Sequence, residues 1–228
     1  MDHGEVSTTN IFCLLGKPGC GRNTILKRVL DDVLFLDKAN MFKLVFGTTR
    51  PIKVNDIEGE TYHFFTKEQY LNLDPKTIIE SRSYDPMFNE EYYYFTLTSH
   101  IRFGSSYICK ASVFQYAEYK KYANTIQLQM PMVRMNIYPI IINAPIFERE
   151  KRLMSLAAVD KDVYDICIKL LQEKYEFETV INENPEIIDS MNPNTLVIDN
   201  GKNDIRNVAL AADKIKKFIN EKIAMQGK

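Results

Sequence analysis

The sequence predicts an α/β fold built around a parallel sheet, and two neighbouring patterns carry this prediction. Residues 11–15 form a short, wholly apolar run that ends at a glycine-rich loop, as buried parallel strands do. From residue 25 to residue 33, apolar side chains recur at helical spacing, with charged side chains on the opposite face. A strand, a loop and a helix therefore follow one another, and the later alternation of strands with helices favours a parallel sheet.

The other elements follow from the same signals. Runs of β-branched and aromatic residues predict strands at residues 42–46, 62–65, 77–81, 93–97, 107–110, 137–143 and 195–198. Amphipathic spacing predicts helices at residues 112–122, 146–156, 162–181 and 205–223. The middle of the chain is thus expected to be rich in strands, between two α/β segments.

Composition excludes several classes of protein. The 228 residues suffice for one sizeable α/β domain with insertions or for two small ones. Because 29 basic residues face 30 acidic ones, we expect neither a nucleic-acid partner nor a membrane partner. The four cysteines lack the spacing of zinc sites or of a disulfide scaffold, and we find no signal peptide and no apolar run long enough to span a bilayer. We therefore expect a cytoplasmic protein; its oligomeric state is not encoded in any pattern.

The glycine-rich loop matches the phosphate-binding P-loop in its glycine spacing. Gly16 and Gly21 are separated by four residues, and Gly19 adds a further position that tolerates positive φ. Backbone N–H groups of such a loop wrap around phosphate oxygens, and the dipole of the following helix favours an anion. A glycine-rich turn that binds nothing is the alternative interpretation.

Two positions depart from the P-loop pattern. Arg22 stands where the pattern has lysine, and Asn23 stands where it has a serine or threonine hydroxyl. Arginine keeps the charge but is planar and forked, so it does not reproduce the compact ammonium group. Thr24 follows directly, and its side chain can offer the hydroxyl that this pattern places on a magnesium ion.

Four short motifs follow the loop in a fixed order. They are Thr48-Thr49-Arg50-Pro51, the stretch 59–64 with Gly59, Tyr62 and Phe64, the pair Ile79-Glu80, and Tyr94-Phe95-Thr96. In this order and spacing the chain resembles the guanylate kinases. The resemblance implies a three-layer P-loop core of the nucleoside monophosphate kinase type, with a parallel sheet, a small β-rich GMP-binding insertion and a helical lid. It divides the chain into core (1–45), GMP-binding insertion (46–100), core (101–145), lid with flanking helices (146–178) and C-terminal core (179–228).

The resemblance also implies a role for each motif residue. Arg50 and Lys53 would hold the GMP phosphate, with Lys53 in place of the usual arginine. Tyr62 and Tyr94 would donate their hydroxyl groups to the same phosphate. Glu80 would accept hydrogen bonds from the guanine N1 and N2 donors, and the Thr96 hydroxyl would contact O6. The set is chemically coherent, because a carboxylate suits a pair of donors and a dianion needs charge-assisted ones. Taken singly, each residue has an ordinary alternative as a solvated charge, a packed tyrosine or a surface cap.

The second half of the chain departs further from the family pattern. Arg152 is the candidate for a retained lid arginine, whereas Leu156 stands where a second arginine is expected and only Lys169 could replace a third. Lys110 ends a predicted core strand where the family has an aspartate. Without the resemblance, residues 148–152 would be interpreted as a solvated helix face of alternating charge.

The implied activity is phosphoryl transfer from MgATP to GMP, giving ADP and GDP in purine nucleotide metabolism. ATP phosphates would contact Gly16, Gly19, Gly21, Arg22, Asn23 and Thr24, with Arg22, Arg152 and Lys169 as catalytic cations. The altered loop and lid keep a second hypothesis open, in which the chain is a catalytically degenerate module of this fold that binds a nucleotide or a protein.

Overall fold

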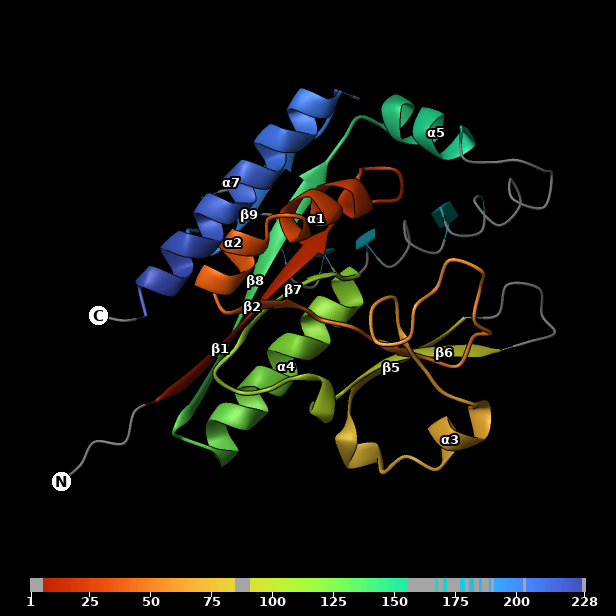
Figure 1. Cartoon of the computed structure of the whole chain (residues 1–228), viewed down its shortest axis with the longest axis vertical. Helices are drawn as coiled ribbons and strands as arrows, with labels where there is room; N and C mark the ends of the chain where they lie inside the picture. Colours follow the sequence, from red (N-terminus) through yellow and green to blue (C-terminus); the bar gives the residue numbers. More distant parts are fainter. Residues whose placement is uncertain are drawn as a thin grey trace.

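The structure is a computed structural model. It describes residues 6–84, 91–155, 167, 170–171, 177–178, 181–182, 185, 189, 191–202 and 204–226. Helices and strands are labelled as in Figure 1.

The core is a five-stranded parallel sheet with the strand order β2-β7-β1-β8-β9. The strands are β2 (Met41–Lys43), β7 (Ser106–Lys110), β1 (Ser7–Leu15), β8 (Val133–Asn143) and β9 (Leu196–Asp199). The expected parallel sheet is therefore confirmed, with β1 at its centre.

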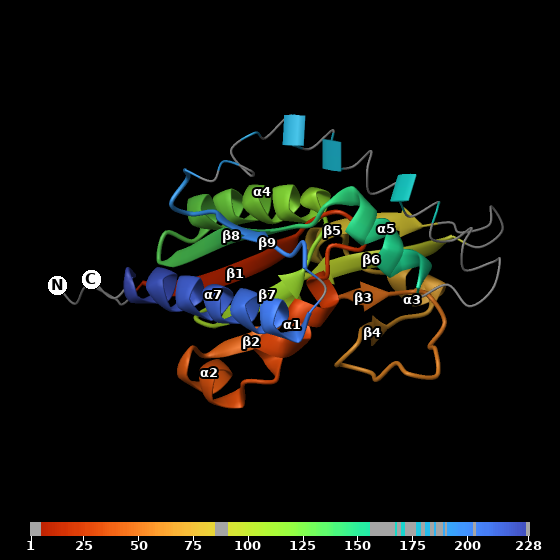
Figure 2. The same ribbon diagram turned by 90° about the horizontal axis from the view of Figure 1, so that it is seen from above.

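Helices cover both faces of this sheet, which gives three layers (Figure 2). Helices α1 (Arg22–Leu30) and α7 (Ile205–Ala224) cover one face, and α4 (Val113–Gln129) covers the other. Along β1, Phe12 and Leu14 pack toward α1 and α7, whereas Ile11 and Cys13 pack toward α4. All four are fully buried, because a central strand covered on both faces has no polar side.

A second sheet lies beside the core, at the lower right of Figure 1, with the order β4-β3-β6-β5. Its strands are β3 (Gly47–Thr48), β4 (His63–Phe64), β5 (Ile78–Tyr84) and β6 (Tyr92–Leu97). Most of this sheet consists of the long antiparallel pair of β5 and β6. Short helices flank these strands: α3 (Lys67–Leu71), with the 3₁₀ turns η1 (Pro75–Thr77) and η2 (Thr98–His100).

Several boundaries differ from the expected ones for local reasons. The first helix begins at Arg22 and ends at Leu30, because Asp32 accepts a hydrogen bond from the Phe35 amide and starts a separate helix, α2 (Val33–Lys38). The expected strand 42–46 is only β2, since the chain turns into the second sheet at Gly47. Helix α5 (Ile146–Met154) agrees with its expected range to within two residues, whereas most of the expected helix 162–181 lies outside the described residues.

None of the described helices combines the length and the apolar character that a transmembrane span requires.

Candidate functional site

The glycine loop joins the end of β1 to the start of α1. Gly16, Gly19 and Gly21 have φ of 147°, 75° and 98°. A Cβ atom on Gly16 would lie 2.4 Å from the Ile142 carbonyl oxygen of β8, so the loop and the sheet approach too closely for any side chain. Within the described residues no side chain caps the N-terminus of α1 at Gly21, and its first turn contains no acidic residue. Both features favour an anion at this end of the helix.

Side chains from distant parts of the chain hold the loop by its carbonyl groups. The Asn200 side chain donates to the Cys20 carbonyl (2.7 Å). Arg152 of α5 donates to the carbonyls of Gly19 (3.2 Å) and Asn200 (2.8 Å), and Arg149 donates to that of Pro18 (3.3 Å). Because C=O and N–H point in opposite directions across a trans peptide unit, carbonyls fixed from one side leave the adjoining N–H groups turned to the other.

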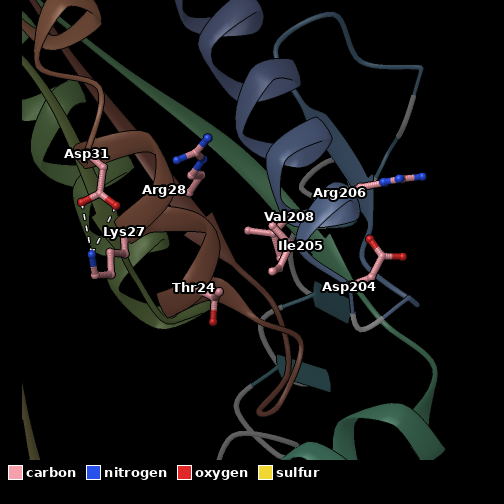
Figure 3. A pocket seen from close by; sticks show the side chains of 8 residues that line it. All are labelled: Thr24, Lys27, Arg28, Asp31, Asp204, Ile205, Arg206 and Val208. Atoms are coloured by element: carbon pink, nitrogen blue, oxygen red, sulfur yellow. Dashed lines mark hydrogen bonds and ion pairs between the residues drawn. The ribbon is translucent and has the colours of Figure 1, made fainter.

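The three residues after the loop are placed differently from one another. The Arg22 guanidinium donates to the Ala111 carbonyl just beyond β7 (3.0 Å), so this cation reaches across the carboxyl end of the core sheet. Asn23 and Thr24 are exposed in the first turn of α1. Thr24 also borders a cavity of about 980 Å³ between α1 and α7 (Figure 3), whose charged lining includes Lys27, Arg28, Asp31, Asp204 and Arg206.

The second sheet buries an acidic group. Glu80 on β5 is only 4% exposed, and its Oε1 accepts hydrogen bonds from the Thr96 hydroxyl (2.7 Å) and the Gln115 amide (3.1 Å). Its Oε2 is buried without a hydrogen-bond partner among the described residues. Burial raises the pKa of Glu80, and the two hydrogen bonds only partly oppose that shift. A buried, unsatisfied carboxylate oxygen is costly, so this site favours a donor beyond those that the described residues supply.

The register of β5 and β6 explains why these groups meet. Glu80 is paired with Thr96 across the two strands, so their side chains share one face of the sheet. The Thr96 hydroxyl donates a hydrogen bond to Glu80. The Tyr119 hydroxyl of α4, 2.8 Å away, is therefore the donor in its hydrogen bond with Thr96. Helix α4 thus fixes the hydroxyl and the carboxylate together.

A cationic and aromatic cluster lies on the same sheet. The Arg50 guanidinium makes two hydrogen bonds to Asp56 (2.7 and 3.0 Å) and lies 5.1 Å from the Tyr62 ring centroid, which lies 5.8 Å from that of Tyr94. Arg50 lowers the pKa of the Asp56 carboxyl, and Asp56 in turn raises the pKa of Arg50. Lys53 is exposed on the loop after Arg50 and donates its backbone N–H to Asp56 (2.7 Å).

The structure therefore gathers most of the expected acceptor residues in one sheet or directly beside its strands, and Lys53 is exposed on the loop after Arg50. It places Arg152 against the glycine loop, and Lys169 lies outside the described residues. Sequence reasoning did not single out several polar groups that hold these residues, namely Asp56, Gln115, Tyr119, Arg149 and Asn200. Of these five residues, only Gln115 belongs to a recognisable sequence motif, because Ser112 and Gln115 form a capping box at the start of α4.

Comparison with known proteins shows what this chain is similar to. The guanylate kinase family model matches residues 8–104, a segment that contains the glycine loop and the whole second sheet. Residues 8–104 of this chain are thus similar to the guanylate kinase family. A guanylate kinase of Mycoplasma genitalium is 29% identical over 174 residues, which cover 75% of this chain and 65% of that protein. A guanylate kinase of Helicobacter hepaticus is 30% identical over 61 residues, which cover 27% of this chain and 28% of that protein. These matches thus span 65% or less of the relatives' own length.

The fold is also similar to that of a guanylate kinase. The crystal structure of guanylate kinase from Anaplasma phagocytophilum superposes with a TM-score of 0.54, covering 95% of this chain and 87% of that one, at 19% identity. At that identity the likeness establishes the fold, a P-loop core of the nucleoside monophosphate kinase type. The family match ends at residue 104, so Arg152 and Lys169 lie beyond the segment that it covers.

Proposed function

We propose that this chain is a guanylate kinase that transfers the γ-phosphoryl group of ATP to GMP. The observation that carries the proposal is the buried Oε2 of Glu80, which lacks a donor among the described residues. Guanine presents two donors, N1–H and the N2 amino group, on one edge. Adenine presents an unprotonated N1 there, so AMP would set a lone pair against a carboxylate. The Thr96 hydroxyl lies beside Glu80 and donates to it, so contact with guanine O6 would require this hydroxyl to turn its proton from Glu80 to the base.

The rest of the site has a role in this reaction. Arg50, Tyr62 and Tyr94 would bind the acceptor phosphate, and the loop from Gly16 to Thr24 would bind the phosphates of ATP. We propose the segment 46–100 as the acceptor-binding part and the segment 146–178 as the lid. Phosphoryl transfer depends mainly on positioning and on cations around the moving group, so no covalent intermediate on the chain is needed.

Magnesium would arrive bound to ATP. The described residues contain no cluster of three or more histidine, cysteine or acidic side chains able to hold a metal ion by themselves. Thr24 is exposed in the first turn of α1, so its hydroxyl fits the role of one protein ligand beside nucleotide oxygens. The ion would neutralise phosphate charge, while the chain's own residues position the two nucleotides.

The proposal is tested by an ADP-release assay with GMP, AMP, CMP and UMP as acceptors and with ATP alone as the baseline. We expect ADP release that depends on GMP and stays near the baseline with the other three. Equal release with AMP would contradict a guanine-specific site, and release that no acceptor stimulates would contradict the kinase proposal.

The altered loop gives a separate prediction. If Arg22 contacts ATP phosphates, Arg22→Ala is expected to raise the KM for ATP by about tenfold or more, because a charge-assisted contact is lost, and to change the KM for GMP little. Arg22→Lys restores the compact ammonium of the usual pattern and should preserve or raise kcat. Steady-state kinetics with each nucleotide varied in turn measures both effects. An unchanged KM for ATP in the alanine variant would remove Arg22 from the site.

The raised pKa of Glu80 predicts a pH dependence of stability. The ordinary glutamate pKa is 4.5, and burial raises the pKa of Glu80 above it in the folded chain. The contribution of Glu80 to the free energy of unfolding is thus complete below about pH 4.5 and is lost as pH rises through the raised pKa. Urea unfolding of the wild type and of Glu80→Gln across this range is expected to show that loss in the wild type alone. Parallel pH profiles would contradict it.

Specific contacts also favour a second candidate, a nucleotide-binding module that has lost transfer. Arg22 and Arg152 both donate to backbone carbonyls, and Lys110 ends β7 at the carboxyl edge of the sheet. Calorimetric binding of GMP, combined with the absence of GMP-dependent ADP release, would favour this module over the kinase.

A further inference from the structure

Strand β5 carries a cation that the proposed reaction has not yet used. Arg82 lies two residues after Glu80, so both side chains project from the same face of the strand. The register pairs Glu80 with Thr96 and Arg82 with Tyr94. Arg82 thus occupies the acceptor face, about 7 Å along the strand from Glu80 at the usual rise per residue.

Arg82, like Arg50, lies close to a tyrosine ring. The Arg82 Cζ atom lies 6.0 Å from the Tyr94 ring centroid, and the Arg50 Cζ atom lies 5.1 Å from that of Tyr62. The two rings are themselves 5.8 Å apart. Two guanidinium groups therefore lie close to the two tyrosines that would bind the acceptor phosphate.

The electrostatics of the tyrosine pair agree with this placement. Burial raises the pKa of both Tyr62 and Tyr94, and the positive charges of Arg50 and Arg82 oppose that shift at each ring. Both cations thus act on the same small volume. A phosphate dianion placed between the hydroxyl groups would experience both charges.

Lys53 is less well placed for this role. Its side chain is exposed on the loop 51–57, where Ile52 and Val54 are also exposed. Arg82 is partly buried on a regular strand, and its planar fork can make two parallel hydrogen bonds to a phosphate, which an ammonium group cannot.

We infer that Arg82, together with Arg50, binds the phosphate of the acceptor nucleoside monophosphate, and that Lys53 contributes little to it. The inference rests on the proposed function, because it needs an acceptor whose base lies at Glu80. The order of Glu80 and Arg82 along β5 matches the layout of a nucleotide, because the phosphate would lie further along the strand than the base.

The experiment compares GMP with guanosine, which keeps the base and lacks the phosphate. Binding of both is measured by calorimetry for the wild type, Arg82→Gln, Arg82→Lys and Lys53→Gln. Arg134→Gln, an exposed arginine on β8 at the other end of the core, is the matched control. Thermal unfolding of each variant reports whether the fold is intact.

The expected result is a loss of GMP affinity of tenfold to a hundredfold in Arg82→Gln, with guanosine affinity unchanged and partial rescue in Arg82→Lys. Lys53→Gln and Arg134→Gln should stay within about threefold of the wild type. Wild-type GMP affinity in Arg82→Gln, or an equal loss for GMP and guanosine, would overturn the phosphate role while leaving the kinase proposal standing. A wild type that binds neither ligand would overturn both.

Discussion

Glu80→Ala is expected to lower kcat/KM for GMP by roughly two to four orders of magnitude. The variant removes the acceptor for two guanine donors, and each hydrogen bond to a charged group contributes about 1.5–3 kcal/mol. It also leaves Thr96 and Gln115 without the carboxylate oxygen to which both donate. Steady-state ADP release with GMP varied at saturating ATP measures the effect.

Glu80→Gln separates recognition from folding. The amide keeps the shape of the side chain but replaces one acceptor oxygen by a donor, so GMP should still be bound poorly. Because burial disfavours the carboxylate, the neutral side chain is expected to raise the unfolding midpoint at neutral pH in the absence of nucleotide. Unimpaired GMP kinetics in either variant would remove Glu80 from the site.

Gly16→Ala is expected to destabilise the fold by roughly 2–5 kcal/mol and to abolish ADP release. The strain of positive φ and the overlap of a new Cβ with the Ile142 carbonyl oxygen both contribute. A backbone oxygen of a central strand cannot move aside as a flexible side chain would. Urea unfolding monitored by circular dichroism measures the loss of stability.

Gly59→Ala is the matched control for this prediction. Gly59 also has positive φ, at 75°, but among the described residues a Cβ there would come within 4 Å of the His63 ring alone, at 3.9 Å. Gly59→Ala should lower the free energy of unfolding by about 1 kcal/mol, from backbone strain at positive φ alone. Equal losses in the two variants would show that close packing against β8 does not matter at Gly16.

The core fold could be predicted from sequence because its signals are local. The apolar run of β1, the glycine loop and the helical spacing of α1 each occupy one short segment, and all three occur in the structure. The boundaries that shifted depended on single side chains such as Asp32, which starts α2. The order of the later motifs added the second sheet through the family resemblance.

The contacts that support the site could not be predicted in the same way. Asn200 reaches the loop at Cys20 from 180 residues away, and Tyr119 meets Thr96 only because α4 packs beside β5. Arg82 carries no motif, and its place beside Tyr94 follows from strand register alone. Such pairings depend on tertiary packing, which no local pattern in a single sequence encodes.

Calorimetric titration of the wild-type chain with GMP and with AMP tests the central claim most directly, because it measures base recognition without requiring turnover. The buried carboxylate of Glu80 predicts that GMP binds and that AMP, at the same concentrations, gives no saturable heat. Equal affinity for the two nucleotides, or no binding of GMP, would contradict the assignment of Glu80 to guanine recognition.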